Sequence, residues 1–265
     1  KTISGIPVPY FEEQSKQFGL DDNSDSNHAS FFDYDRDGDL DLFILNHKIG
    51  FKDSAKFRLK EQKDGSMKRI KTPETPFESN RLYRNDGGRF TDVTAIAGLV
   101  SSAFGLSATP VDIDRDGWLD IYVANDFIEP DNVYFNNRDG TFTDHFFDYF
   151  KHTSHFSMGT DATDFNNDGL VDIIVVDMKS GDHVRYKELA NPMQYDKYNL
   201  MVQYGYGRQP GRNMLQLNCG NNTFIDIGQF AGVSATDWSW TPLMADFNND
   251  GWKDIYITNG YRRDV

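Results

Sequence analysis

The sequence predicts an all-β protein, a β-propeller whose blades are four-stranded antiparallel sheets. One motif, Asp-x-Asp/Asn-x-Asp-Gly-x-x-Asp, occurs four times, and each copy leads into a short run of aliphatic and aromatic residues. A phenylalanine stands at the same distance before every copy. The apolar runs have the length of strands, and no long helical pattern interrupts them. A small β unit repeated in this way is typical of propeller blades.

The repeated motif has the pattern of a calcium-binding loop between the first two strands of a blade. Side-chain oxygens are expected at positions 1, 3, 5 and 9 and a backbone carbonyl at position 7, while the glycine at position 6 permits the sharp turn. The predicted ligands are Asp33, Asp35, Asp37, Asp39 and Asp41; Asp112, Asp114, Asp116, Trp118 and Asp120; Asp164, Asn166, Asp168, Leu170 and Asp172; and Asp246, Asn248, Asp250, Trp252 and Asp254. The sequence therefore predicts up to four Ca²⁺ ions.

An EF-hand and an ordinary hairpin turn both fit the motif less well than this calcium loop. An EF-hand loop begins in the same way, but it needs a glutamate at position 12 and helices on both sides. Position 12 holds Ile44, Val123, Val175 and Ile257, so the EF-hand is excluded. Asp, Asn and Gly also gather in hairpin turns, but turn chemistry alone does not place ligands in register four times.

A fixed spacing defines the rest of the repeat. Phe11, Phe90, Phe142 and Phe224 each precede the first aspartate of a loop by 22 residues, which predicts an outer strand and a link before each blade. The shortest unit reads as strand, calcium loop, strand LDIYVAN, connection, strand NVYFNN, tight turn and strand TFTDHFF. The predicted parts are an outer strand and link at 1–26, blade 1 at 27–99 with an insertion at 47–79, blade 2 at 100–151, blade 3 at 152–233 with an insertion at 178–211, and the first half of blade 4 at 234–265.

This plan gives an incomplete propeller of about three and a half blades. So few blades do not close a typical ring, and the open edges would be pairing surfaces. We therefore expect either that the chain is part of a longer protein or that another chain completes the ring.

The charge of the chain agrees with metal binding and disfavours nucleic acid. The formal net charge is −14, and positions 1, 3, 5 and 9 of the four loops supply 14 carboxylates. Four calcium ions would bring the net charge to about −6. A protein that neutralises phosphates needs a basic face instead. Because Asn166 and Asn248 replace an aspartate at position 3, the third and fourth loops are expected to bind calcium more weakly.

The predicted location is outside the cytosol, because calcium loops of modest affinity fill where calcium is plentiful. No apolar stretch approaches the roughly 18 residues of a membrane helix, so no transmembrane segment is expected. The single cysteine, Cys219, excludes an internal disulfide. No signal peptide is visible, and the chain begins at Lys1 as expected after processing or trimming.

Several segments resemble the FG-GAP/VCBS repeat proteins of the cartilage acidic protein, or ASPIC/UnbV, type, closest to the large members from Bacteroidetes. They are the four loops, LYRNDGGRFTDVTAIAGL at 82–99, TDWSWTPLMADFNNDGWKDIYITNG at 236–260 and YRRDV at the end. The resemblance implies integrin-α-like blades with calcium between their first two strands. It also implies a secreted or lipoprotein binding scaffold at the cell surface, often beside outer-membrane uptake systems of the SusC/SusD type. It implies no reaction.

The two insertions are the predicted ligand-binding elements. Both fall in the second turn of a blade, and therefore on the face opposite the calcium loops, where binding loops on a rigid scaffold are expected. The first, 47–79, is rich in lysine and arginine and suits an acidic glycan or surface, although a solvated loop is the simpler interpretation. The second, 178–211, carries tyrosines and arginines that suit sugar stacking or a protein interface. Packing of that insertion on its own blade is an equal alternative.

Three functions remain open at this point. The first is a non-catalytic binding module for a glycan or a protein, and the second is a structural subunit of a membrane complex with outer-membrane partners. The third is a polysaccharide lyase or hydrolase, for which His152, His155 and the tyrosines would have to share one cleft. The histidines show no zinc spacing and no nucleophile motif is present. All four tryptophans are expected to be structural. Trp118 and Trp252, at position 7 of their loops, are expected to cover the calcium loop and to pack between blades.

Overall fold

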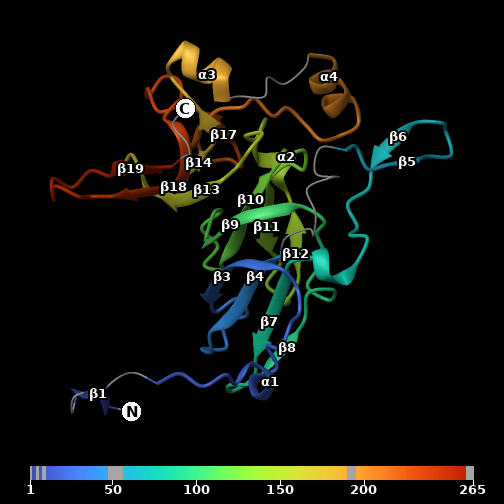
Figure 1. Ribbon diagram of the computed structural model, residues 1–265, viewed down its shortest axis with the longest axis vertical. Coiled ribbons are helices and arrows are strands. Elements are labelled where there is room, and N and C mark those ends of the chain that lie inside the picture. Colours follow the sequence, from blue (N-terminus) through green and yellow to red (C-terminus); the bar gives the residue numbers. More distant parts are fainter. Residues whose placement is uncertain (1, 4–5, 8–9, 47–55, 190–194, 261–265) are drawn as a thin grey trace.

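The computed structural model describes residues 2–3, 6–7, 10–46, 56–189 and 195–260, and these form a partial β-propeller (Figure 1). Blade 1 consists of β3 (Ser26–Phe32), β4 (Asp41–Asn46), β7 (Arg81–Asn85) and β8 (Phe90–Asp92). Blade 2 consists of β9 (Phe104–Val111), β10 (Asp120–Asp126), β11 (Asn132–Asn136) and β12 (Phe142–Asp144). Blade 3 consists of β13 (Gly159–Thr163), β14 (Asp172–Val176), β16 (Met214–Asn218) and β17 (Phe224–Asp226). In each blade the strands lie side by side in chain order and pair antiparallel.

A half blade follows the three complete ones. It consists of β18 (Asp237–Ala245) and β19 (Asp254–Asn259), which pair antiparallel. The short strand β15 (Met178–Lys179), which belongs to the second insertion, pairs with the other edge of β18. In the part of the chain that the structure describes, the sheets do not close into a ring. The all-β propeller class expected from the repeat is confirmed.

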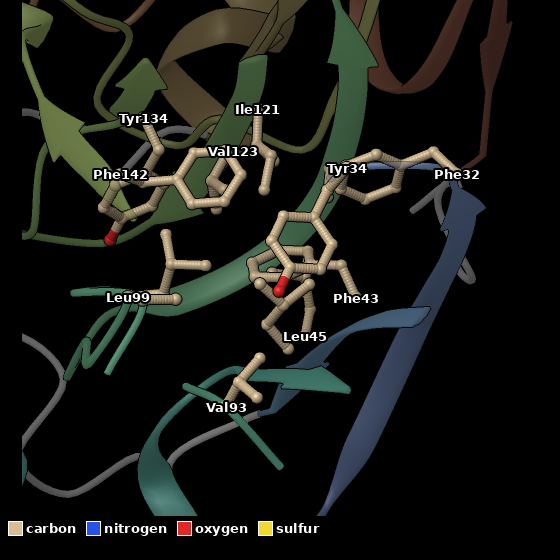
Figure 2. Close-up of a cluster of buried hydrophobic side chains, with 13 residues drawn as sticks. Phe32, Tyr34, Phe43, Leu45, Val93, Leu99, Ile121, Val123, Tyr134 and Phe142 are labelled. Atoms are coloured by element: carbon tan, nitrogen blue, oxygen red, sulfur yellow. The ribbon is translucent and has the colours of Figure 1, made fainter. Parts of the chain in front are cut away.

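The core lies between neighbouring blades, because the second strand of each blade is apolar on both faces. Residues of β4 and β7 in blade 1 pack against residues of β10, β11 and β12 in blade 2, as Figure 2 shows for Phe43, Leu45, Ile121 and Val123. A second cluster joins blades 2 and 3, and a third joins blade 3 to the half blade. The second strands β10 and β14 are therefore continuous runs of buried residues, the pattern of a sheet that is covered on both faces.

Polar side chains fix the end of the second strand in all three blades. The residue directly before the third strand accepts a backbone N–H from the end of the second strand or the residue just after it. The three bonds are Asn46 to Asn80 at 3.3 Å, Asn125 to Asp131 at 2.9 Å and Asp177 to Asn213 at 2.7 Å. These side chains are almost fully buried. Because a buried backbone N–H without a partner is costly, these contacts hold the end of the second strand to the start of the third in each complete blade.

The links between blades are short helical turns, and here two details of the expected strands are wrong. No strand forms at Phe11, which is 89% exposed; α1 (Ser15–Phe18) follows it instead. An outer strand needs a third strand to pair with, and none of the described residues supplies one there. In the second blade the predicted strand TFTDHFF ends at Asp144, because its carboxylate accepts the N–H of Phe146 and α2 (Phe146–Tyr149) begins.

Each link packs on the outer strand of the following blade. This packing explains why 22 residues separate each phenylalanine from the first aspartate of the next loop. A Cβ at Gly19 would lie 2.5 Å from the carbonyl oxygen of Phe90, and one at Gly98 would lie 3.0 Å from that of Phe142. Both glycines also have positive φ angles, of 81° and 77°. A larger residue therefore meets both a steric and a conformational barrier.

The insertions contain their own small elements. The first holds the hairpin of β5 (Leu59–Glu61) and β6 (Met67–Arg69) and the short helix η2 (Pro76–Glu78). The second holds β15, α3 (His183–Leu189) and α4 (Tyr195–Gln203). Near the N-terminus β1 (Thr2–Ile3) pairs with β2 (Ile6–Pro7). Among the described residues no helix is long and apolar enough to cross a membrane.

Candidate metal centres

All four predicted calcium loops have the same backbone geometry. Position 4 has a positive φ of about 61° in every loop (Arg36, Arg115, Asn167 and Asn249 at 61°, 62°, 61° and 61°), and the glycine at position 6 has φ between 83° and 95°. The carboxylate at position 1 accepts the N–H of that glycine at 2.8 to 3.1 Å. The carboxylate at position 5 accepts the N–H of position 7 at 2.7 to 2.9 Å. The turn therefore holds the side chains of positions 1, 3 and 5 toward one another.

The first two loops bring three carboxylates close together. Ligand oxygens of Asp33, Asp35 and Asp37 lie within 4.8 Å of one another, and so do those of Asp112, Asp114 and Asp116. Oδ1 of Asp33 is buried and has no hydrogen-bond partner among the described residues. Hard oxygen donors that converge with an unsatisfied lone pair fit a calcium ion.

The electrostatics of position 3 also fit a cation. Burial and the neighbouring carboxylate of position 5 raise the pKa of Asp35 and of Asp114 above the ordinary value. Such repulsion is relieved by a bound cation, which would keep both groups ionised.

Position 9 has a different task from the other ligand positions. Asp120 is buried and accepts the N–H of Ile113 and that of Asn136, both at 2.9 Å. Equivalent pairs of bonds form at Asp41 and Asp172. The position 9 carboxylate therefore ties the loop to the third strand. Burial raises the pKa of Asp41 to about 6 and that of Asp120 to about 7, so these groups lie in the least solvated part of the loop.

The third and fourth loops keep the same turn with an amide at position 3. Nδ2 of Asn166 donates to Oδ2 of Asp168 at 2.9 Å, and Oδ1 of Asn248 accepts the N–H of Asp250 at 2.9 Å. Asp246 in the fourth loop is solvated, and hydrogen bonds from the loop backbone, led by the N–H of Gly251, lower its pKa. Trp252 is 58% exposed; it does not pack between blades as expected, because none of the described residues forms a blade beyond β19.

Neighbouring loops touch through position 4, a contact that the motif did not predict. The guanidinium of Arg36 lies 5.4 Å from the ring centre of Trp118 in the second loop, and Nδ2 of Asn167 donates to the carbonyl of Gly251 in the fourth loop at 2.9 Å. Arg138, from the turn between β11 and β12, forms an ion pair of 2.6 Å with Asp116. One sequence feature could have indicated these contacts between loops: position 4 holds a long polar residue, such as Arg36 or Asn167. All these contacts lie on one rim of the propeller.

The opposite face carries the two insertions, and they pack on each other. Phe57 and Leu59 of the first insertion contact Tyr204, Tyr206 and Met201 of the second, together with Ile128 between β10 and β11. The hydroxyl of Tyr206 accepts the N–H of Arg58 at 2.8 Å. Figure 1 shows the β5–β6 hairpin beside the segment that holds α4. The first insertion is thus built onto the scaffold from 56 onward, while the predicted basic residues Lys48 and Lys52 lie outside the described residues, as does the YRRDV segment.

The two candidate histidines have separate structural contacts. Nε2 of His152 lies 3.1 Å from Oδ2 of Asp226, which also pairs with Arg212. His155 is 5% exposed and lies 3.1 Å from the amide oxygen of Gln209. Burial lowers the pKa of His155 to about 4, so the ring is neutral near pH 7. Among the described residues, His152 and His155 therefore have different hydrogen-bond partners.

Comparison with known proteins identifies the repeat. The FG-GAP-like repeat family matches residues 74–123, 112–175 and 201–257. No curated protein matches the chain. Among solved structures, a lectin from Agrocybe aegerita, described as recognising non-reducing terminal N-acetylglucosamine, matches with 18% identity and a TM-score of 0.41 over 87% of this chain and 46% of the lectin. The chain therefore spans less than half the length of that lectin. With three repeats matched over more than half of its length and the blades in place, the chain belongs to the FG-GAP-like repeat family.

Proposed function

We propose that this chain is a calcium-stabilised β-propeller module that binds a glycan at the cell surface without catalysing a reaction. The observation that carries the proposal is the loop geometry. Four loops share one turn, in the first two the carboxylate oxygens of positions 1, 3 and 5 lie within 4.8 Å of one another, and in the first a buried carboxylate oxygen lacks a partner among the described residues. The affinity for calcium follows from this donor set.

Calcium would act here as a structural ion. When bound, it neutralises the converging carboxylates and fixes the turn between the first two strands of each blade. The chain's own residues then pass this rigidity on, since the position 9 carboxylate joins the loop of each complete blade to the third strand. The blades become a stiff support for the opposite face.

The ligand face is the one that carries the insertions. Its elements lie on a rigid scaffold and pack on each other through Tyr206 and Phe57, which favours a preformed binding surface. A small pocket with both polar and apolar walls opens beside the β5–β6 hairpin. Its size suits one sugar residue better than a protein side-chain cluster, and this favours a glycan over a protein partner.

The location and the finer family type belong to the same proposal. The resemblance to ASPIC/UnbV-type proteins of Bacteroidetes and the need for abundant calcium favour an exported protein at the outer membrane or outside the cell. In that setting the module would serve an outer-membrane complex of the SusC/SusD type as an accessory glycan binder.

A glycan array tests this function. The chain, labelled on Cys219, which is exposed, is applied to immobilised glycans in millimolar calcium and in chelator. We expect a restricted set of glycans to bind in calcium and to be released by the chelator. If no glycan binds while a protein from the source membrane co-purifies stoichiometrically, the module is a structural subunit and the glycan proposal is wrong.

A further inference from the structure

The strongest unassigned feature is a pocket of about 210 Å³ on the insertion face. Its wall combines three parts of the chain that are far apart in sequence. Arg69 and Lys71 come from the first insertion, Ser101 and Ser102 from the link between blades 1 and 2, and Glu129 and Asn132 from the connection after β10 and the start of β11. The pocket therefore exists only when the insertion is docked on blade 2.

The pocket contains a buried cation with unused hydrogen-bonding capacity. The side chain of Arg69 is only 7% exposed. Nη1 of this residue lies 3.4 Å from Oε2 of Glu129 in an ion pair, yet it makes no hydrogen bond within the described part of the chain. A buried donor left without an acceptor costs free energy. An acceptor supplied by a ligand would recover that cost.

The guanidinium of Arg69 is held in place from outside the pocket. Its carbon lies 5.4 Å from the ring centre of Tyr206, which belongs to the second insertion. Tyr206 is itself fully buried and hydrogen-bonded to Arg58. A planar guanidinium held over a fixed ring can present its free edge to a planar acceptor such as a carboxylate. The contact with Tyr206 also means that both insertions build the pocket.

A second cation stands at the pocket mouth. Lys71 has a side chain 66% exposed, with Nζ 3.6 Å from Oδ2 of Asp144. The hydroxyl of Ser102 donates to the carbonyl of Lys71 at 3.2 Å, which holds this segment at the rim. Ser101, Ser102 and Asn132 add neutral polar groups to the wall, which also includes Asp144 and the apolar residues Val100, Ala103 and Pro130. The pocket thus offers two cations, each paired with a carboxylate of the pocket wall, together with several neutral polar groups.

We propose that this pocket binds the carboxylate-bearing residue of an acidic glycan, with Arg69 and Lys71 receiving the carboxylate. The inference rests on the proposed glycan-binding function and names its substrate class. The hydroxyl groups of the sugar meet the polar side chains of the wall, and Glu129 keeps Arg69 oriented when the pocket is empty. A neutral hexose offers the wall the same hydroxyl groups but gives the two cations no charge to bind.

The test measures binding of D-glucuronate, D-glucose and acetate to the calcium-loaded chain by isothermal titration calorimetry. We expect glucuronate to bind, and glucose and acetate to bind at least about tenfold more weakly, because each lacks one half of the contacts. Arg69→Gln and Lys71→Gln should each weaken glucuronate binding by about tenfold or more. Lys71 is exposed, so its variant tests the site even if Arg69→Gln loosens the hairpin.

The matched control is Lys68→Gln, an exposed lysine on the same strand β6 that does not line the pocket. It should bind glucuronate as the unmodified chain does. Equal binding of glucuronate and glucose, no binding of either, or unchanged glucuronate binding in both pocket variants would overturn the assignment. If the glycan array is positive while those results are obtained, only the pocket assignment fails. If the array is empty as well, the proposed function fails with it.

Discussion

The substitution Asp112→Ala tests the metal function of one loop in isolation. Asp112 is the position 1 residue of the second loop, and its carboxylate accepts the N–H of Asp116 at 3.0 Å and that of Gly117 at 2.9 Å. The substitution removes these two hydrogen bonds as well as a predicted calcium ligand. Its effect should therefore have one part that does not depend on calcium and one that does.

The two parts have different sizes. Each lost hydrogen bond contributes about 1 kcal/mol, so the variant should be about 2 kcal/mol less stable than the parent chain in chelator. A site saturated at about 100 times its dissociation constant adds about 2.7 kcal/mol to the folded state. The variant should therefore lose about 4 to 5 kcal/mol in calcium.

The assay is urea unfolding followed by tryptophan fluorescence, in chelator and in calcium, for the parent chain and the variant. Asp139→Ala is the control on the same rim, because Asp139 also accepts two bonds in a turn, from the N–H and the hydroxyl of Thr141, but lies outside the loops. Its effect should be the same in both conditions. Equal calcium stabilisation of the Asp112→Ala variant and the parent chain would refute the metal function of this loop.

Three further predictions concern the scaffold. Asn213→Ala should cost about 2 to 4 kcal/mol in urea unfolding, because it strands the buried N–H of Asp177 and the carbonyl of Val233; a loss below about 0.5 kcal/mol would contradict the role given to the strand-end contacts. Gly159→Ala should lower the melting temperature, since a Cβ there would lie 2.3 Å from the carbonyl oxygen of Trp240. An unchanged melting temperature would contradict a tight contact between β13 and β18. Burial raises the pKa of Asp126 to about 7, above the unfolded value of about 4. Its contribution to stability is therefore full at low pH and is lost as the pH rises toward 7. Asp126→Asn should accordingly be more stable than the parent chain at about pH 8 and similar near pH 4, and the same difference at both pH values would contradict the shift.

Local chemistry made the blades predictable from the sequence. The aspartates and glycine of each loop define a turn by themselves, and the run after each loop is apolar at nearly every position because it is buried on both sides. The constant interval from Phe90 or Phe142 to the next loop follows from the helical link, which packs on the next outer strand through Gly98 against Phe142 in one case and through Phe150 against Phe224 in the other. Each of these constraints lies within one repeat or between neighbouring repeats, so it produces a pattern that recurs along the sequence and can be predicted from it.

The ligand face was less predictable, because its contacts join segments without a repeat. Arg69 was only one of several basic residues in an insertion that composition describes as solvated. Its partners are Glu129 and Tyr206, which are 60 and 137 residues further along the chain. The failed strand at Phe11 has the same origin, since pairing depends on a neighbour that its local sequence does not specify.

Counting the bound metal ions is the most direct test of the calcium function. The chain is dialysed against millimolar free calcium and then against stepwise lower concentrations, and the bound calcium is determined by elemental analysis, for the parent chain and for variants with alanine at position 1 of each loop. We expect close to four ions per chain, with one ion lost in each variant and the weakest retention in the third and fourth loops. A chain that retains no calcium, or variants that retain as much as the parent chain, would contradict a calcium-stabilised propeller.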